Sequence, residues 1–179
     1  MKVLISKESN QLDFVNFWSS QYRYSNESLY DLNIGKELTE ERIIELFQWK
    51  NGTPLSEKKM QSVRENYLKD KTLFPIAPSI DFIKSELAKP GGTIWRIFWI
   101  HCHYPQMYPI YDQHVHRAMA HIQGWNNIEI PEYNKAKIQM YLKHYLPFHS
   151  QFGGMDHKKV DEALWAYGKF LTQTPSMLS

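Results

Sequence analysis

Hydrophobic residues recur every three or four positions through most of this chain, and such spacing is typical of amphipathic α-helices. Between these stripes stand polar segments that contain Gly or Pro and read as loops. The stripes are Leu12, Val15, Phe17 and Trp18; Ile43, Ile44, Leu46 and Phe47; Met60, Val63 and Tyr67; Ile80, Ile83 and Leu87; Ile138, Tyr141, Leu142 and Tyr145; and Val160, Leu164, Tyr167 and Leu171.

Helix starts and stops agree with this pattern. A Ser, Thr or Asp that can cap a helix N-terminus precedes most of the apolar stripes. These capping residues are Thr39, Ser56, Ser79, Asp112 and Asp156. Gly52 and Gly124 are typical residues for helix ends, and we expect the helix that opens at Pro131-Glu132 to end at Pro147.

Residues 94–100 (Ile-Trp-Arg-Ile-Phe-Trp-Ile) are nearly all apolar, so periodicity does not distinguish a buried helix from a buried strand. We favour a buried central helix because the rest of the chain offers no convincing strand for pairing. The sequence therefore predicts an all-α fold, a compact bundle of about eight helices.

Length and composition narrow the class of protein. With 179 residues the chain is long enough for a sizeable core, and we expect a single domain over 1–179, or at most two small lobes. The net charge of +2 is compatible with a nucleic-acid partner without requiring one. Neither a signal peptide nor an apolar run long enough to cross a bilayer is recognisable, so we expect a cytoplasmic protein with no membrane partner.

The most informative segment is Pro109-Ile-Tyr-Asp112-Gln-His114-Val-His-Arg117. Asp112 stands at the mouth of a predicted helix, where N–H groups and the helix dipole keep a carboxylate charged. Such a carboxylate either caps the helix and does nothing more, or stabilises positive charge on a ligand in a cleft. The second use would be catalytic.

A glycine hairpin, Pro90-Gly91-Gly92, lies between two predicted helices, and Asp112 follows Gly92 by 20 residues. With Asp112-x-His114-Val-x-Arg117 and a closing helix at 160–169, this order resembles the helix-hairpin-helix DNA glycosylase superfamily over about residues 79–170. Residues 1–75 match no family that we recognise. The resemblance implies that the closing helix packs near the aspartate, and that the hairpin is a shortened form of the family's.

The resemblance also implies a reaction. A base flips out of the DNA stack, and water hydrolyses its N-glycosidic bond while Asp112 stabilises the charge on the sugar. The lysine that bifunctional members carry after the hairpin is missing, so the expected enzyme is monofunctional, without strand cleavage. No cofactor is expected, since the single cysteine, Cys102, rules out the iron–sulfur cluster of some relatives.

The resemblance implies that DNA is the partner, and a cytoplasmic protein that binds DNA would be nucleoid-associated. Together with the residue chemistry, it nominates two sets of residues for contact with DNA. The base-binding candidates are aromatic or heteroaromatic: Trp95, Trp99, Tyr108, Tyr111 and His114. The DNA-backbone candidates offer N–H groups or positive charge: Gly91, Gly92, Arg96 and Arg117.

Each assignment has a structural alternative that stays open at this stage. Trp95 and Trp99 are four residues apart, the spacing of helix packing; His114 suits a structural hydrogen bond, and Arg117 a solvated face. For the whole chain, the alternative is a DNA-binding or protein-interaction module that retains the fold without the reaction.

A histidine excess suggests a third class, a metal-dependent hydrolase. His101-Cys102-His103 stands near His114, His116 and His121, but no usual metal-ligand spacing occurs, and we expect no metal site. His144, His149 and His157 are expected at the surface.

Overall fold

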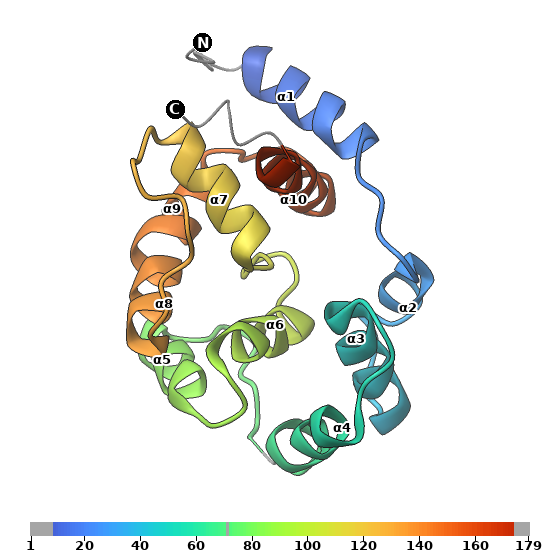
Figure 1. The fold of residues 1–179 in the computed structure, drawn as a ribbon. Helices are drawn as coiled ribbons and strands as arrows, with labels where there is room; N and C mark the ends of the chain where they lie inside the picture. The colour runs from blue at the N-terminus through green and yellow to red at the C-terminus, as the bar shows by residue number, and fades with distance from the viewer. Residues whose placement is uncertain (1–8, 71, 174–179) are drawn as a thin grey trace. The chain divides into compact units, whose positions relative to one another are not determined.

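The computed structural model describes residues 9–70 and 72–173, and every regular element in them is helical, which confirms the all-α prediction. Two short π-helical turns, η1 and η2, continue the α-helices before them. The elements are α1 Ser9–Ser20, α2 Glu27–Asp31, α3 Glu40–Asn51, α4 Glu57–Val63, η1 Arg64–Leu68, α5 Ile80–Ala88, α6 Thr93–His103, α7 Gln113–Ile122, α8 Asn134–Met140, η2 Tyr141–Tyr145, α9 Leu146–Ser150 and α10 His157–Gln173 (Figure 1).

The chain divides into two compact units. Unit 1 comprises Met1–Arg23 and Pro109–Ser179, and unit 2 comprises Tyr24–Tyr108. Unit 2 is thus one continuous stretch, whereas unit 1 is assembled from both ends of the chain. The division falls after Arg23 and after Tyr108, and not between residues 75 and 79, where we expected the glycosylase-like part to begin.

In unit 1, α10 is the central helix and packs against both α1 and α7 (Figure 1). Aromatic rings join α1 to α10: Phe14 meets Tyr167 edge to face with ring centroids 5.3 Å apart, and Trp18 lies 4.9 Å from the same ring. These ring contacts, together with the buried Val15, hold α1 in place.

In unit 2, α6 is the core helix. Ile97, Phe98 and Ile100 are fully buried, and Phe47 of α3 packs on Phe98 with ring centroids 5.5 Å apart. Residues 94–100 are apolar around most of the helix because neighbours cover most of its surface. The prediction of a buried helix rather than a strand is confirmed.

The predicted N-caps are also confirmed. Each capping side chain accepts a hydrogen bond from a backbone N–H of the first helical turn, which removes one of the unsatisfied donors there. The bonds are Thr39 from Arg42 (3.4 Å), Ser56 from Lys59 (3.4 Å), Ser79 from Phe82 (3.1 Å), Asp112 from His114 (2.9 Å) and Asp156 from Lys159 (2.9 Å).

The prediction that Pro147 ends a helix is wrong. The helix begins at Asn134 rather than at Pro131-Glu132, and helical structure continues through Pro147 to Ser150. The π turn η2 changes the hydrogen-bond register just before Pro147, which therefore falls in the first turn of α9. A proline is tolerated there because that position needs no N–H.

No helix within residues 9–70 and 72–173 combines the length and the apolar character needed to cross a membrane.

Candidate active site

Asp112 N-caps α7. Its Oδ1 accepts hydrogen bonds from the backbone N–H of His114 at 2.9 Å and of Val115 at 3.2 Å. The side chain is half-buried. A negative charge is therefore fixed at the positive end of the α7 dipole, in an orientation set by two backbone donors.

The three residues before Asp112 are each held by a side chain from elsewhere in unit 1. The Tyr141 hydroxyl donates to the carbonyl of Pro109 at 3.1 Å, and the N–H of Ile110 donates to Asp161 Oδ2 at 3.3 Å. The Tyr111 hydroxyl lies 2.7 Å from His116 Nδ1. The turn that presents Asp112 is therefore rigid, with anchors in η2, α7 and α10.

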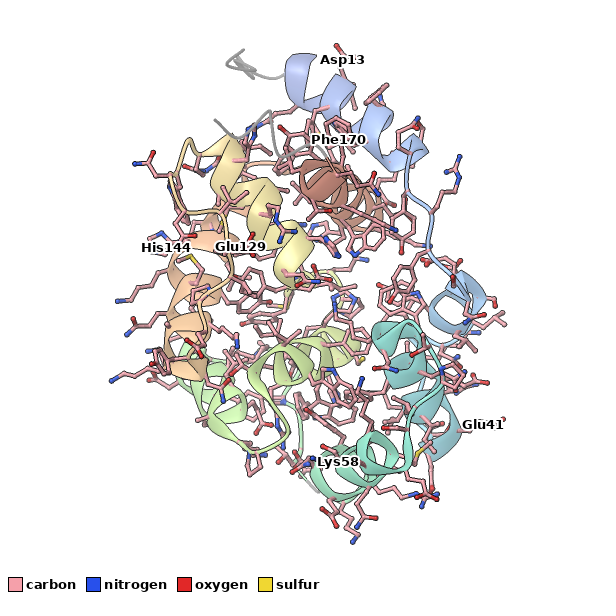
Figure 2. The ribbon with its side chains drawn as sticks, viewed as in Figure 1. Asp13, Glu41, Lys58, Glu129, His144 and Phe170 are labelled. Carbon is pink, nitrogen blue, oxygen red and sulfur yellow. The ribbon has the colours of Figure 1, made fainter. Side chains whose placement is uncertain are left out.

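Asp161 also pairs with His149, whose Nε2 lies 3.1 Å from Asp161 Oδ1. Both side chains are largely buried, so the expectation that His149 is a surface residue is wrong. The pairing partner stands 12 residues away on another helix, and the local sequence therefore contained no sign of it. His144, by contrast, is exposed as expected (Figure 2).

The tyrosines behind Asp112 are buried and stay neutral. Burial raises the pKa of Tyr111, and the nearby charge of Asp112 raises it further. The pKa of Tyr145 is raised well above 10.0 by burial and then by Asp161, with Asp112 contributing to the same shift. Burial likewise lowers the pKa of His116, whose ring also hydrogen-bonds to the backbone of Glu129. A neutral His116 that donates to that backbone accepts a hydrogen bond from the Tyr111 hydroxyl at Nδ1.

Helix α10 packs directly beside the Asp112 turn, as the family resemblance implied. A Cβ built on Gly168 would lie 1.9 Å from the carbonyl oxygen of His114, so only glycine fits at this crossing. The ring of His114 meets Trp165 at a centroid distance of 5.1 Å. His114 is thus placed two residues from Asp112, between its own helix and α10.

Arg117 does not lie on a solvated face. It is only 7% exposed, and its Nη2 contacts both carboxylate oxygens of Glu129 at 3.1 Å (Figure 2 labels Glu129). The pair ties α7 to the loop that follows it. This contact already occupies the group that we nominated for DNA phosphates.

The Pro90-Gly91-Gly92 hairpin of unit 2 links α5 to α6. Gly91 and Gly92 both have positive φ, 112° and 87°, which other residues rarely adopt. Gly91 also has no room for a side chain, because a Cβ there would lie 2.5 Å from the Tyr67 hydroxyl oxygen. That hydroxyl donates to the Gly91 carbonyl at 2.9 Å, so both glycines have structural reasons to be there.

Arg96 is an internal support of this hairpin. Its side chain is 2% exposed; Nε donates to the Pro90 carbonyl at 2.6 Å, Nη2 to the Asn66 carbonyl at 2.9 Å, and Nη1 to Asp70 at 3.1 Å. Burial alone would raise the pKa of Asp70. Hydrogen bonds from Thr72, Arg96 and Lys89 outweigh it and lower that pKa to about 2. Arg96 therefore has an internal structural role, and the groups of this hairpin that remain candidates for a phosphate contact are backbone N–H groups.

The remaining base-binding candidates belong to unit 2 and pack in its interior. Trp95 lies against Phe47 at 5.2 Å between ring centroids, and Trp99 lies 5.7 Å from Tyr67. Tyr108 is 8% exposed, and its carbonyl lies 2.8 Å from His101 Nδ1. The structure thus brings Tyr111, His114 and Arg117 into the unit of Asp112 and places the other candidates in unit 2.

The histidine excess does not assemble into a metal centre in the described part of the chain, where no three potential ligands come together. His101 instead bridges two groups: its Nδ1 lies 2.8 Å from the Tyr108 carbonyl, and its Nε2 lies 2.8 Å from the Tyr30 hydroxyl. His121 pairs with Tyr167 at 2.8 Å. These rings act as buried hydrogen-bonding links between helices.

No family model, curated protein or solved structure matches this chain. The candidate role of Asp112 therefore depends on the geometry of the residues around it. The turn before Asp112 is held by Tyr141, Asp161 and His116, and His149 pairs with Asp161. The sequence nominated none of these four residues for a site around Asp112. The one signal in the sequence was the expectation that a closing helix over residues 160–169, which contains Asp161, packs near Asp112.

Proposed function

We propose that this protein is a monofunctional DNA-glycosylase-like enzyme in which Asp112 is the catalytic carboxylate. The single observation that supports this most directly is the pinned turn at Pro109–Asp112. Tyr141 and Asp161 hold the backbone before Asp112, and His116 holds the side chain of Tyr111. On the other side, the α7 N-terminus fixes the Asp112 carboxylate. An N-cap needs no such support, whereas a catalytic charge must be held in place before the reaction.

The chemistry follows from that fixed charge. As the bond between the sugar C1′ and the base nitrogen breaks, its electrons leave with the base, and positive charge develops on the sugar. The Asp112 carboxylate stabilises that charge through space. A water oxygen then bonds to C1′ and loses a proton, and the departing base gains one. No lysine nucleophile is needed, and the strand stays intact.

The hairpin supports DNA as the partner. Helix α6 starts at Gly92 without any side-chain cap, so its first N–H groups are not used by a capping residue within the described chain. Phosphates bind well at such helix N-termini. The buried contacts of Arg96 and Tyr67 keep the hairpin rigid, which lowers the entropic cost of a backbone contact.

The decisive experiment compares the wild type with Asp112→Asn on duplexes that carry uracil, oxidised, alkylated or mismatched bases. Asparagine caps helices about as well as aspartate, so this change removes the charge and keeps the cap. We expect the variant to form abasic sites, detected as alkali-induced breaks, about 100-fold more slowly or worse.

Asp156→Asn is the matched control. Asp156 caps α10 in the same way but lies outside the pinned turn, so this variant is expected to keep full activity. Full activity in Asp112→Asn would refute the proposal. Salt-sensitive binding without breaks from the wild type would replace it with a non-catalytic DNA-binding module.

A further inference from the structure

Unit 1 has a surface hollow of about 370 Å³ between α1 and α10, which we call the α1–α10 groove. Its main lining residues are Phe17, Trp18, Arg23, Trp165, Lys169 and Phe170, and the other described side chains that line it are uncharged. Figure 2 labels Phe170 where α10 faces α1. The volume is within the range of small-ligand sites, about 300–1,000 Å³.

Aromatic rings form the walls of the groove. Trp18 lies 5.2 Å from Phe170 and meets Phe17 edge to face at 5.1 Å between centroids. Phe17 is 58% exposed, although it is a large apolar side chain. A flat ligand would cover this exposed ring and gain stacking contacts with it.

The charges of the groove have one sign. Arg23 and Lys169 are both exposed, and none of the described residues that line the hollow carries a carboxylate. Lys169 Nζ lies 4.7 Å from the ring centroid of Trp165, so a cation is held directly at an aromatic wall. The groove is therefore complementary to a ligand that is flat at one end and anionic at the other.

We propose that the α1–α10 groove binds single-stranded DNA, with one nucleobase against the Phe17 and Trp18 rings and its phosphate beside Lys169 and Arg23. Nucleotides have this combination of an aromatic face and a negative charge. Stacking on aromatic side chains next to cations is how proteins bind single strands without reading their sequence. An acidic or apolar peptide would satisfy only one of the two features.

The groove adjoins the candidate active site through Trp165, whose ring contacts both the groove and His114. The proposed binding does not require base excision. The groove would bind the strand, and Asp112 would take part in base excision, so either proposal can fail without the other.

The test measures binding of a fluorescein-labelled eight-nucleotide thymidine strand to the full chain by fluorescence anisotropy. A second probe has the same length and phosphates, but tetrahydrofuran replaces every nucleoside sugar and base. We expect the thymidine strand to bind at least about fivefold more tightly, because base stacking contributes beyond charge.

Two variants address the groove, and each has a matched control on the same helix. Phe17→Ser is compared with Leu12→Ser, since Leu12 is 51% exposed on α1 outside the groove. Lys169→Gln is compared with Lys159→Gln, which changes an exposed lysine elsewhere on α10.

We expect each groove variant to weaken binding of the thymidine strand about fivefold or more, and each control less than twofold. Circular dichroism and thermal melting verify that all four variants are folded. Equal affinity of the two probes, no binding by the wild type, or equal effects of groove and control variants would overturn the inference. Loss of binding in the groove variants of a protein that forms no abasic sites would leave the inference standing and refute only the glycosylase.

Discussion

At the scale of single residues, Asp112 shows how a common local feature becomes a candidate catalytic group. Its N-cap bonds are ordinary, and Asp156 makes the same kind of bond on α10. What differs is the segment before it, where Pro109, Ile110 and Tyr111 are each tied down. A carboxylate held this firmly has little freedom to reorganise when charge develops nearby.

His103 in unit 2 is the residue from which we expect a measurable pH effect on stability. Its ring stacks on Phe74 with centroids 3.5 Å apart, and its Nε2 has no hydrogen-bond partner within the described chain. Burial lowers its pKa from 6.5 to about 4, although the charge of Asp70 opposes the shift. The unfolded chain therefore binds a proton at a higher pH than the folded chain does.

The stability that depends on neutral His103 is present above pH 6.5 and is lost as the pH falls towards 4. The loss is at most about 3 kcal/mol, and partial exposure reduces it. His103→Phe keeps a stacked ring without a titrating group. Urea unfolding between pH 7 and 4.5 should therefore show a shallower loss of stability in this variant, with the remainder due to other histidines such as His116. Parallel curves for the two proteins would contradict this prediction.

Asp70 acts in a separate pH window. Its folded pKa of about 2 lies below the ordinary 3.8, so its contribution is present above pH 3.8 and is lost between there and pH 2. The two groups can therefore be distinguished in one acid titration.

At the scale of helices, α7 and α10 cross at Gly168 with no room for a side chain between them. Because a Cβ there would overlap the His114 carbonyl, any other residue forces the helices apart. The same movement would shift the backbone two residues from Asp112. Helix packing and site geometry thus depend on one glycine.

Gly168→Ala is expected to destabilise the protein by about 3 kcal/mol or more, as overpacking in a tight core does. Gly153→Ala is the control, since its Cβ would meet only the Ser150 carbonyl at 3.4 Å and its φ is not positive. Urea midpoints should fall clearly for the first variant and stay within about 0.5 kcal/mol for the second. Equal stability of both variants would mean that α7 and α10 tolerate separation.

At the scale of the whole molecule, the chain ends build one unit and the middle builds the other. Unit 1 therefore depends on α1, which is remote in sequence from the helices that it covers. Phe14 and Trp18 both pack on Tyr167 of α10, and Trp18 packs on Phe170 as well.

Deleting residues 1–23 should loosen unit 1 selectively. Loss of the buried Val15 and of these half-buried rings removes a few kcal/mol of apolar burial, since full burial of a large side chain contributes about 1.5–3 kcal/mol. Hydrogen exchange followed by mass spectrometry should show α7 and α10 losing protection by about tenfold or more, with α3 and α6 much less affected. An equal loss in all four helices would contradict the division into two units.

The sequence by itself determined most of the helices, their caps and the place of Asp112, although it did not predict the short helix α2. These features depend on neighbours within about four residues: apolar spacing, a capping oxygen, and a glycine or proline at the boundary. The error at Pro147 is local too, because a π turn just before it moved the proline into the first turn of a helix.

Only the tertiary structure decided which polar residues are buried and which groups they bind. Arginine usually lies at the surface, and we expected His149 there too, but Arg96, Arg117 and His149 are each buried against a partner. The partners are the Pro90 and Asn66 carbonyls with Asp70 for Arg96, Glu129 for Arg117 and Asp161 for His149. Those partners lie 6 to 30 residues away along the chain. The burial of a charged group depends on contacts formed after the helices pack, and no local pattern in the sequence specifies them.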